Sequence, residues 1–307
     1  MNFPTLSDSE RLKRLTPPKG KVRMVLDTDT YNEIDDQFAL VYALLSPEKL
    51  SVEAIYAAPF FNDRSTGPGH GMKLSYDEIL RLLERMDVSP DGLVYRGSTD
   101  YVGPERKAQD NDAVRDLIAR AKASSPDDPL YVVAIGAISN VTSAIMLEPD
   151  IIKNIVVVWL GGHALNWPDV REFNLKQDVP GVQILLDSGV PLVLIPCRGV
   201  TTHLHSTVPE IEHYVEPCGD IGAFLAQRFK EYSTEHIGWS KVIWDMANIG
   251  YLLDESWVPT ELVHSPILTD QVTWSVDRSR HLIRYANYVR RDPIFKDFFT
   301  KLAAFTN

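Results

Sequence analysis

The sequence has little cysteine, since Cys197 and Cys218 are the two in its 307 residues. Two cysteines are too few for a disulfide framework, and their spacing matches no metal-binding motif. Basic residues are outnumbered, with 31 Lys and Arg against 42 Asp and Glu and a formal net charge of −11. This charge argues against a broad attraction to nucleic acid or to an anionic membrane. We therefore expect neither of these partners, but a small molecule that is neutral or cationic.

Long apolar runs are also missing. The longest, NIVVVWLGG and GVPLVLIPC, fall far short of the ~20 residues that a membrane-spanning helix needs. The N-terminal MNFPTLSDSERLKRLTPPKG has scattered charges and no apolar core of a secretory signal, so we expect a cytoplasmic protein. With 44% hydrophobic and 24% charged residues, the composition is that of a folded globular protein.

The order of apolar and amphipathic segments predicts an α/β fold. From Val22 on, short runs such as VRMVLDT, YVVAIG and NIVVVWLGG alternate with amphipathic segments, as strands alternate with helices. Strands that are apolar throughout are typical of a parallel sheet with both faces covered. We predict an open, doubly wound, mostly parallel, Rossmann-like sheet, with a helical cap around residues 219–253 and a small antiparallel C-terminal region. Residues 1–20 form a surface lead-in, and residues 21–307 form one catalytic domain.

Ligands of such sheets bind beyond the carboxyl ends of the strands, and the first strand ends in an acidic cluster. The segment MVLDTDTYNEIDDQFAL places Asp27, Asp29, Glu33, Asp35 and Asp36 within ten residues. Like charges this close repel unless a cation neutralises them. The helix dipole could favour Asp35 and Asp36 by ~0.3–1 kcal/mol each, but it does not account for Asp27 and Asp29. Oxygen ligands with no His or Cys nearby favour Ca²⁺ or Mg²⁺.

This segment resembles the first motif of the inosine-uridine preferring nucleoside hydrolases, a strand running into D-x-D-P-G-x-D-D. Here Asp29 precedes Asp35 by six positions instead of four, and TYNEI replaces the Pro-Gly turn. Three later segments also resemble family motifs, in the family's order: VVAIGAISNVTSAI, VVWLGGHALNWPDVREFN and VIWDMANIGYLL. The resemblance covers roughly residues 22–253. It implies the nucleoside hydrolase fold and, by analogy with relatives, a homodimer or homotetramer.

The resemblance implies a site that hydrolyses the N-glycosidic bond of a ribonucleoside to ribose and free base. Calcium would be held by Asp29, Asp36, Asp245 and the main-chain carbonyl of Ile135. Asp29 would also be the general base for a water on this metal, and Asp27 would support the loop. The implied substrate contacts are Asp35, Asn62, Asn166, Glu172, Asn174 and Trp244.

Several of these residues have a plain structural alternative. Glu172 and Asn174 could cap loops, and Trp244 could be a core residue instead of a stacking partner for the base. Trp244 stands where many family members have a histidine that assists the leaving base, so the leaving-group acid and the base preference stay open. Further candidates for contacting the base are Tyr232, His236, Trp239, His163 and His70.

Two other functions remain as alternatives. The segment DTDT also matches the start of haloacid-dehalogenase-like phosphohydrolases, but PLVLIPCRG supplies neither the late lysine nor the acidic pair that they need. The second alternative is a ribose-binding relative without catalytic activity. The set of Asp29, Asp36 and Asp245 argues against it, because burying unpaired carboxylates is costly.

Overall fold

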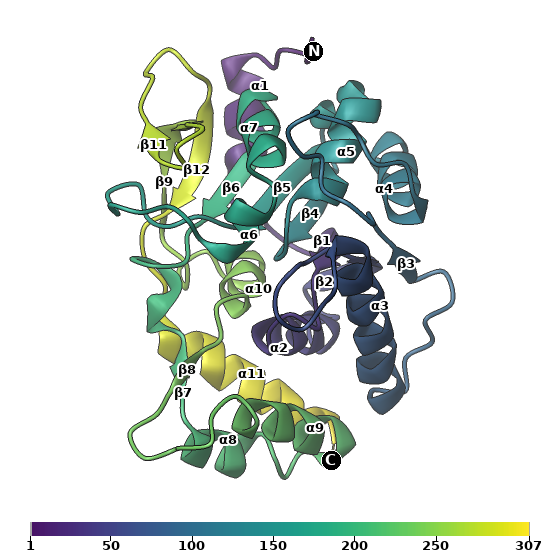
Figure 1. The fold of residues 1–307 in the computed structure, drawn as a ribbon, viewed down its shortest axis with the longest axis vertical. Coiled ribbons are helices and arrows are strands. Elements are labelled where there is room, and N and C mark those ends of the chain that lie inside the picture. The colour runs from purple at the N-terminus through teal and green to yellow at the C-terminus, as the bar shows by residue number, and fades with distance from the viewer. Residues whose placement is uncertain (1, 307) are drawn as a thin grey trace.

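The computed structural model describes residues 2–306, and its centre is an eight-stranded sheet (Figure 1). The strand order is β3-β2-β1-β4-β5-β6-β12-β9, and β9 alone among them runs antiparallel to its neighbour. The strands are β1 (Val22–Thr28), β2 (Leu50–Ala57), β3 (Val94–Arg96), β4 (Leu130–Ala134), β5 (Ile155–Leu160), β6 (Leu192–Ile195), β9 (Thr260–His264) and β12 (Leu282–Ala286). The predicted open, doubly wound sheet is therefore confirmed.

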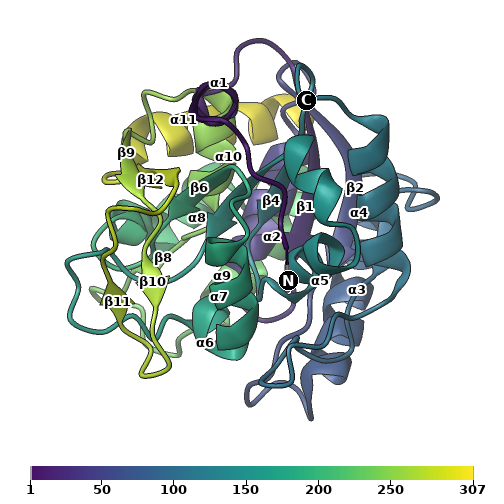
Figure 2. The ribbon, with the colours of Figure 1, turned by 90° about the horizontal axis from the view of Figure 1, so that it is seen from above.

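Helices cover both faces of this sheet (Figure 2). In β5, Val156 and Val158 face one apolar layer, whereas Val157 and Trp159 face the other, as the period of two in a strand requires. Because every residue of β4, β5 and β6 is buried, these strands are apolar throughout. On one face lie α2 (Asp35–Leu44), α3 (Pro68–Arg85), α10 (Met246–Leu253) and α11 (Arg291–Phe305). On the other lie α4 (Asp112–Ala123), α5 (Ser139–Leu147) and α7 (Val179–Asp187).

The N-terminal lead-in contains a helix that we did not predict, α1 (Asp8–Leu15). Ser7 and Glu10 form a capping box at its start. Arg11 donates to the Gly189 carbonyl at 2.8 Å and Arg14 to the Lys153 carbonyl at 2.8 Å, so the helix is fixed to the domain through main-chain acceptors. The division of the chain at residue 20 stays a prediction.

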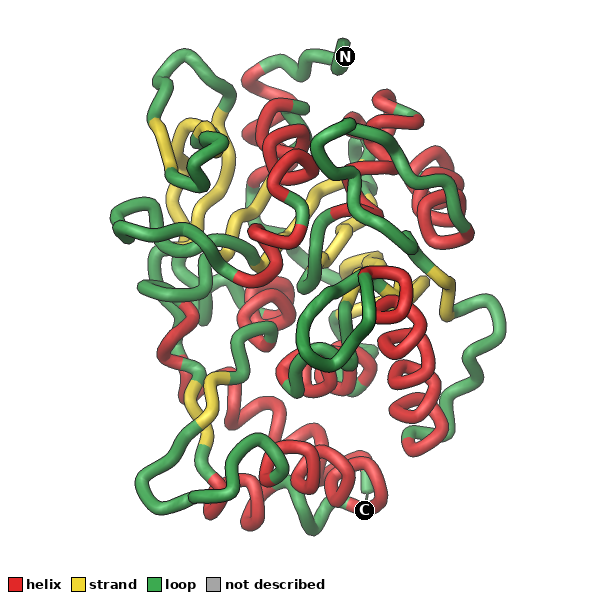
Figure 3. Tube along the Cα trace, in the orientation of Figure 1, coloured by secondary structure: helices red, strands yellow, loops and turns green. Residues whose placement is uncertain are grey.

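The predicted helical region around residues 219–253 contains two separate helices. It consists of α9 (Gly219–Lys230) and α10, and between them lie a loop and the short strand β8 (Lys241–Val242). β8 pairs with β7 (His205–Ser206) apart from the main sheet (Figure 3). The remaining elements are α6 (Phe173–Gln177), α8 (Val208–Tyr214), two 3₁₀ turns at Pro149–Lys153 and Thr201–His203, and the antiparallel pair β10 (Ile267–Leu268) and β11 (Trp274–Ser275).

The predicted antiparallel C-terminal strands are present. β12 pairs antiparallel with β9 and parallel with β6, so the C-terminal strands extend the main sheet. Among residues 2–306, every helix is too short or too polar to cross a lipid bilayer. The strand order reverses direction between β1 and β4, and at such a point the loops leaving neighbouring strands separate and leave a crevice.

Candidate active site

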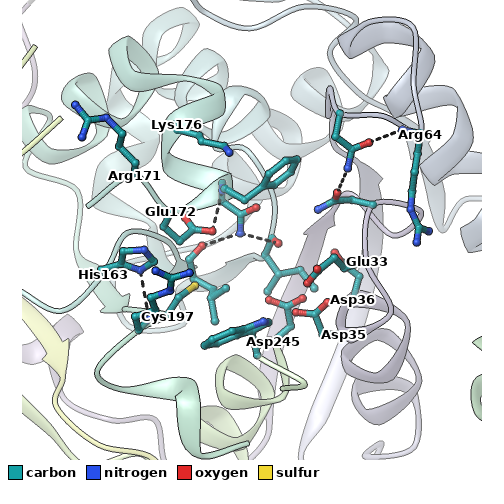
Figure 4. Close-up of a pocket in the computed structure, with 18 of the residues that line it drawn as sticks. Glu33, Asp35, Asp36, Arg64, His163, Arg171, Glu172, Lys176, Cys197 and Asp245 are labelled. Atoms are coloured by element: carbon teal, nitrogen blue, oxygen red, sulfur yellow. Dashed lines mark hydrogen bonds between the residues drawn. The ribbon is translucent and has the colours of Figure 1, made fainter. Parts of the chain in front are cut away.

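A cavity of about 570 Å³ lies at the carboxyl ends of the central strands (Figure 4). Its wall includes residues from the segments that follow β1, β4 and β6, together with Asp245 at the start of α10. Ile135 and Cys197 come from two of these strand ends, and Asp245 is the residue before α10. This volume falls within the ~300–1,000 Å³ typical of sites for small molecules. The cavity is therefore where the fold class predicts a ligand.

Three carboxylates from distant parts of the chain meet in this cavity. Asp35, Asp36 and Asp245 each offer an oxygen, and these oxygens lie within 4.8 Å of one another. All three side chains are at most 4% exposed. Asp36 accepts a hydrogen bond from the Thr28 hydroxyl at 2.5 Å, but one oxygen each of Asp35 and Asp245 has no hydrogen-bond partner. A buried carboxylate oxygen without a partner is costly, so this cluster calls for a cation.

Asp29 lies beside this cluster, and its carboxylate group lacks hydrogen-bond partners altogether. It is 1% exposed, and neither of its carboxylate oxygens has a hydrogen-bond partner. A Cβ atom on Gly136 would lie 2.9 Å from Oδ1 of Asp29, so the glycine lets the chain after Ile135 approach this carboxylate. Asp29 and the carbonyl of Ile135 are thereby held close to each other.

Burial and mutual repulsion raise the pKa of these carboxyl groups. Burial is the largest cause for Asp29, and the charges of Asp36 and Asp35 add to it. Burial raises the pKa of Asp36 to about 7, and it also raises the pKa values of Asp35 and Asp245 well above their usual range. Strongly perturbed acids that gather in one cavity are typical of functional sites.

The donor set fits a hard divalent cation. The carboxylates and the Ile135 carbonyl are all oxygen ligands, which Ca²⁺ and Mg²⁺ prefer. The Ile135 carbonyl accepts a hydrogen bond from the Asn174 side chain at 3.1 Å. A carbonyl oxygen has two lone pairs, so one of them is left for a metal ion.

Glu172 and Asn174 have the structural role that we named as the alternative to substrate binding, because their side chains hold the cavity wall in place. Glu172 caps α6 by accepting from the main-chain N–H groups of Asn174 at 2.8 Å and Leu175 at 2.9 Å, and it also accepts from Gly162 at 3.0 Å. Asn174 donates to the carbonyls of Ile135 and Leu160, each at 3.1 Å. Both residues also line the cavity, so capping does not remove them from it.

The other predicted substrate contacts divide into two groups. Asn62 and Trp244 line the cavity, and the Asn62 side chain donates to Asn32 at 2.7 Å. Asn166, in contrast, is exposed on the loop after β5 and is not part of the cavity wall formed by the described residues. Of the further candidates for contacting the base, Tyr232 and His163 line the cavity.

His70, His236 and Trp239 lie outside that wall and have structural contacts instead. The His236 ring lies 2.8 Å from the Ser233 carbonyl. The Trp239 ring packs edge-on against Phe229, with ring centroids 5.2 Å apart. His70 accepts from the main-chain N–H of Thr66 at 3.1 Å. Each of these contacts stabilises local structure rather than facing the carboxylate cluster.

Asp27 is fully buried behind the cavity and not in its wall. It accepts a hydrogen bond from the Asn140 side chain at 2.7 Å, and burial raises its pKa to about 7. Asn140 also accepts from the main chain of Ser98 at 2.7 Å. This arrangement ties β1 to the loop after β3, in keeping with the supporting role predicted for Asp27.

One cation near the carboxylates was missed in the sequence. Lys241 forms an ion pair with Glu33 at 2.9 Å and lies 4.8 Å from the centre of the Tyr232 ring. Its charge lowers the pKa of Asp35, but burial and the charge of Glu33 raise that pKa by more. Lys241 and Glu33 are 208 positions apart in the sequence, so no local spacing could have indicated the pair.

Comparisons with known proteins agree with the resemblance found in the sequence. A family model described as "Inosine-uridine preferring nucleoside hydrolase" matches residues 76–291, a stretch that begins after the acidic loop. The pyrimidine-specific ribonucleoside hydrolase RihA of Salmonella arizonae is 28% identical over 232 residues, which cover 68% of this chain and 71% of RihA. RihA of Klebsiella pneumoniae is 27% identical over 234 residues, covering 69% of this chain and 72% of that protein.

Solved structures share the fold over nearly the whole chain. The purine-preferring ribonucleoside hydrolase from Gardnerella vaginalis superposes with a TM-score of 0.75 and 21% identity, covering 92% of this chain and 99% of that one. The plant nucleoside hydrolase PpNRh1 gives a TM-score of 0.73 and 20% identity over 94% of this chain and all of its own. Together with the family match, these findings establish that the chain belongs to the inosine-uridine preferring nucleoside hydrolase family and is a hydrolase acting on N-glycosyl bonds.

Proposed function

We propose that this protein is a calcium-dependent hydrolase that splits a ribonucleoside into ribose and free base, with Asp29 as the general base. The observation that carries the proposal is the set of buried carboxylate oxygens without partners on Asp29, Asp35 and Asp245. Asp29 follows β1, Asp35 begins α2 and Asp245 precedes α10, and burying carboxylates from three segments together is costly without a compensating cation.

The metal ligands that we propose are Asp29, Asp36, Asp245 and the carbonyl of Ile135. Four protein ligands leave room in the 6–8 oxygen shell of calcium for water and for the 2′ and 3′ hydroxyls of ribose. Bound calcium supplies Lewis acidity that makes a neighbouring water more acidic and orients the sugar diol. Asp35 is left to accept a hydrogen bond from a ribose hydroxyl.

The residues of the chain perform the remaining steps. Asp29 takes a proton from water as the water oxygen bonds to C1′ of the ribose, and the C1′–N bond to the base breaks through an oxocarbenium-like state. Asn174 keeps the Ile135 carbonyl aimed into the site, and Glu172 fixes α6 below it. Trp244 lines the cavity, and we propose that the base stacks on its ring.

One assay tests this function against both alternatives. The protein is incubated with inosine, uridine and a phosphomonoester, with calcium or with a chelator, while reducing sugar and phosphate are measured. We expect ribose release that requires calcium. Phosphate release without ribose would favour the phosphohydrolase, and nucleoside binding without turnover would favour the ribose-binding relative.

Replacing Trp244 with alanine tests base stacking. Base–aromatic stacking is worth ~1–3 kcal/mol, so we expect KM for inosine to rise about 5–150-fold. Trp244→Phe keeps a ring and is expected to retain most of the affinity. If Trp244 serves only as packing, the alanine variant will have a lower melting temperature and an unchanged KM.

Assembly into a homodimer or homotetramer and a cytoplasmic location also remain proposals. The first is supported only by the analogy with relatives. Sedimentation velocity of the purified protein measures the assembly directly, and a monomer at micromolar concentration would contradict it.

A further inference from the structure

The carboxylate of Asp29 has no hydrogen bond that would fix its place. Neither of its oxygens has a partner, although the side chain is buried. A catalytic group works well only when it is held within about 0.5 Å of its productive position. The position of the Asp29 carboxylate therefore depends on the main chain on either side of it.

The main chain after Asp29 is held by the side chain of Gln37. Its Nε2 donates to the carbonyl of Thr30, the residue next to Asp29, at 3.3 Å. The main-chain N–H of Asn32 donates to the Asp29 carbonyl at 2.7 Å and closes a turn there. Gln37 is 3% exposed and lies in the first turn of α2, where an amide without partners would be costly. Gln37 thus ties α2 to the loop that carries Asp29.

The Gln37 amide is oriented by a buried carboxylate, that of Glu78 on α3. Nε2 of Gln37 also donates to Oε1 of Glu78 at 3.2 Å, so the two hydrogens of this nitrogen have two acceptors. An ionised carboxylate only accepts hydrogen bonds, so Glu78 keeps the amide nitrogen of Gln37 facing it. Turning the amide over would place its oxygen against two other acceptors. The orientation that Glu78 selects is the one that holds Thr30.

Two arginines compensate the charge of Glu78, which is 0% exposed. Arg228 of α9 donates to both of its oxygens, at 3.0 and 3.3 Å, and Arg81 of α3 donates at 2.5 Å. A buried ion pair is weak evidence for stability, since apolar residues of similar volume often serve a fold equally well. The contacts of Glu78 indicate a different role, which is to fix one arrangement of α3, α9 and the loop after Asp29.

The same two helices also hold the next residue of the loop, Tyr31. Its main-chain N–H donates a long hydrogen bond of 3.5 Å to the hydroxyl of Ser75 on α3. Ser75 precedes Glu78 by three positions, so both side chains lie on one face of this helix. The Arg228 guanidinium lies 5.8 Å from the centre of the Tyr31 ring. Two consecutive residues after Asp29 are thus positioned from α3 and α9.

We propose that Glu78 is a positioning residue for the active site, because it orients Gln37 and thereby fixes Asp29. The proposal rests on the proposed function, in which Asp29 is both a calcium ligand and the general base. Within the described chain, Glu78 is not part of the cavity wall, so it acts through other residues. Replacing groups that orient metal ligands typically costs about 10–100-fold in metal affinity or activity. A displaced base slows the chemical step more than it weakens substrate binding.

Two variants test this role by different routes. Gln37→Leu removes the contacts to Thr30 and Glu78 but leaves the two ion pairs of Glu78 intact. Glu78→Gln removes the charge that orients Gln37. For both we expect the calcium Kd, measured by calorimetry, to rise and kcat at saturating calcium to fall, each by about 10–100-fold, with little change in KM. A lower melting temperature with unchanged calcium Kd and kcat in both variants would overturn the inference.

Glu53→Gln is the matched control. Glu53 lies in the first half of β2, away from the carboxyl ends of the strands. It pairs with Arg23 at 2.6 Å and with Arg120 at 3.5 Å, so it has two arginine partners, as Glu78 has. We expect this variant to have a lower melting temperature and an unchanged calcium Kd and kcat. Losses as large as those of Glu78→Gln would overturn the inference, because any broken ion pair would then have the same effect.

Hydrogen exchange separates this inference from the proposed function, because it needs neither calcium nor substrate. In the metal-free protein, the main-chain N–H of Asn32 reports on the turn after Asp29. We expect it to exchange faster in Gln37→Leu and Glu78→Gln than in the parent protein or in Glu53→Gln. Faster exchange in a protein that hydrolyses no nucleoside would support the positioning role and contradict the proposed chemistry. Unchanged exchange, calcium Kd and kcat in an active hydrolase would overturn the inference and leave the proposed function intact.

Discussion

Replacing Asp29 with asparagine is expected to lower kcat for nucleoside hydrolysis by about 10²–10⁴-fold, the usual contribution of a general base. Asparagine has the shape of aspartate but cannot take a proton from water. Neither oxygen of Asp29 accepts a hydrogen bond in the fold, so the variant loses no structural contact. Because it removes a buried charge, the metal-free variant should be at least as stable as the parent protein.

Asp27→Asn is the matched control for this prediction. Asp27 is two positions earlier, on β1, and equally buried, but it accepts a hydrogen bond from Asn140, whereas Asp29 has no hydrogen-bond partner and lies beside the charges of Asp35 and Asp36. We expect Asp27→Asn to change the melting temperature and to leave kcat within a few fold of the parent value. Steady-state kinetics and thermal unfolding in chelator check both variants. Full activity of Asp29→Asn would refute its assignment as the base.

The fold was predictable because its signal is local and repeated. Strands such as β5 are buried on both faces, which forces every position to be apolar and marks the strand in the sequence. The helix α1 escaped prediction because its segment is polar and is held by Arg11 and Arg14 through carbonyls far away in the sequence. The break between α9 and α10 was missed because tertiary contacts decide it, and Gly238 there has a positive φ of 69°.

The candidate site was predictable in part for the same reason. Asp29, Asp35 and Asp36 are neighbours in sequence at the end of one strand, so their crowding is visible without a structure. Asn166 belongs to an irregular loop, where no periodicity specifies which side chain turns inward, and it is exposed. Lys241 pairs with Glu33 across 208 positions of sequence, and a single cation in a sequence indicates only a solvated surface.

Calcium is expected to stabilise the protein strongly at pH 8 and only weakly at pH 5. Burial raises the pKa of Asp36 from an ordinary value of 3.8 to about 7, and Asp29, Asp35 and Asp245 shift in the same direction. As pH rises from 4 through 7, the unfolded chain releases protons that the metal-free folded protein retains. The metal-free protein therefore loses stability over this range. Calcium binds the ionised carboxylates, so it reverses this loss at high pH and competes with protons at low pH.

The size of the effect follows from mass action. Calcium at about one hundred times its dissociation constant adds ~2.7 kcal/mol of stability. At about 1.5 °C per kcal/mol for a chain of 307 residues, the melting temperature in calcium should exceed that in chelator by about 4 °C at pH 8. Thermal scans at matched ionic strength measure this difference at each pH, and surface groups cancel because they are common to both conditions. Asp245→Asn removes one of the carboxylates and should shrink the difference at pH 8. A difference that is larger at pH 5 than at pH 8 would contradict the binding of calcium by these carboxylates.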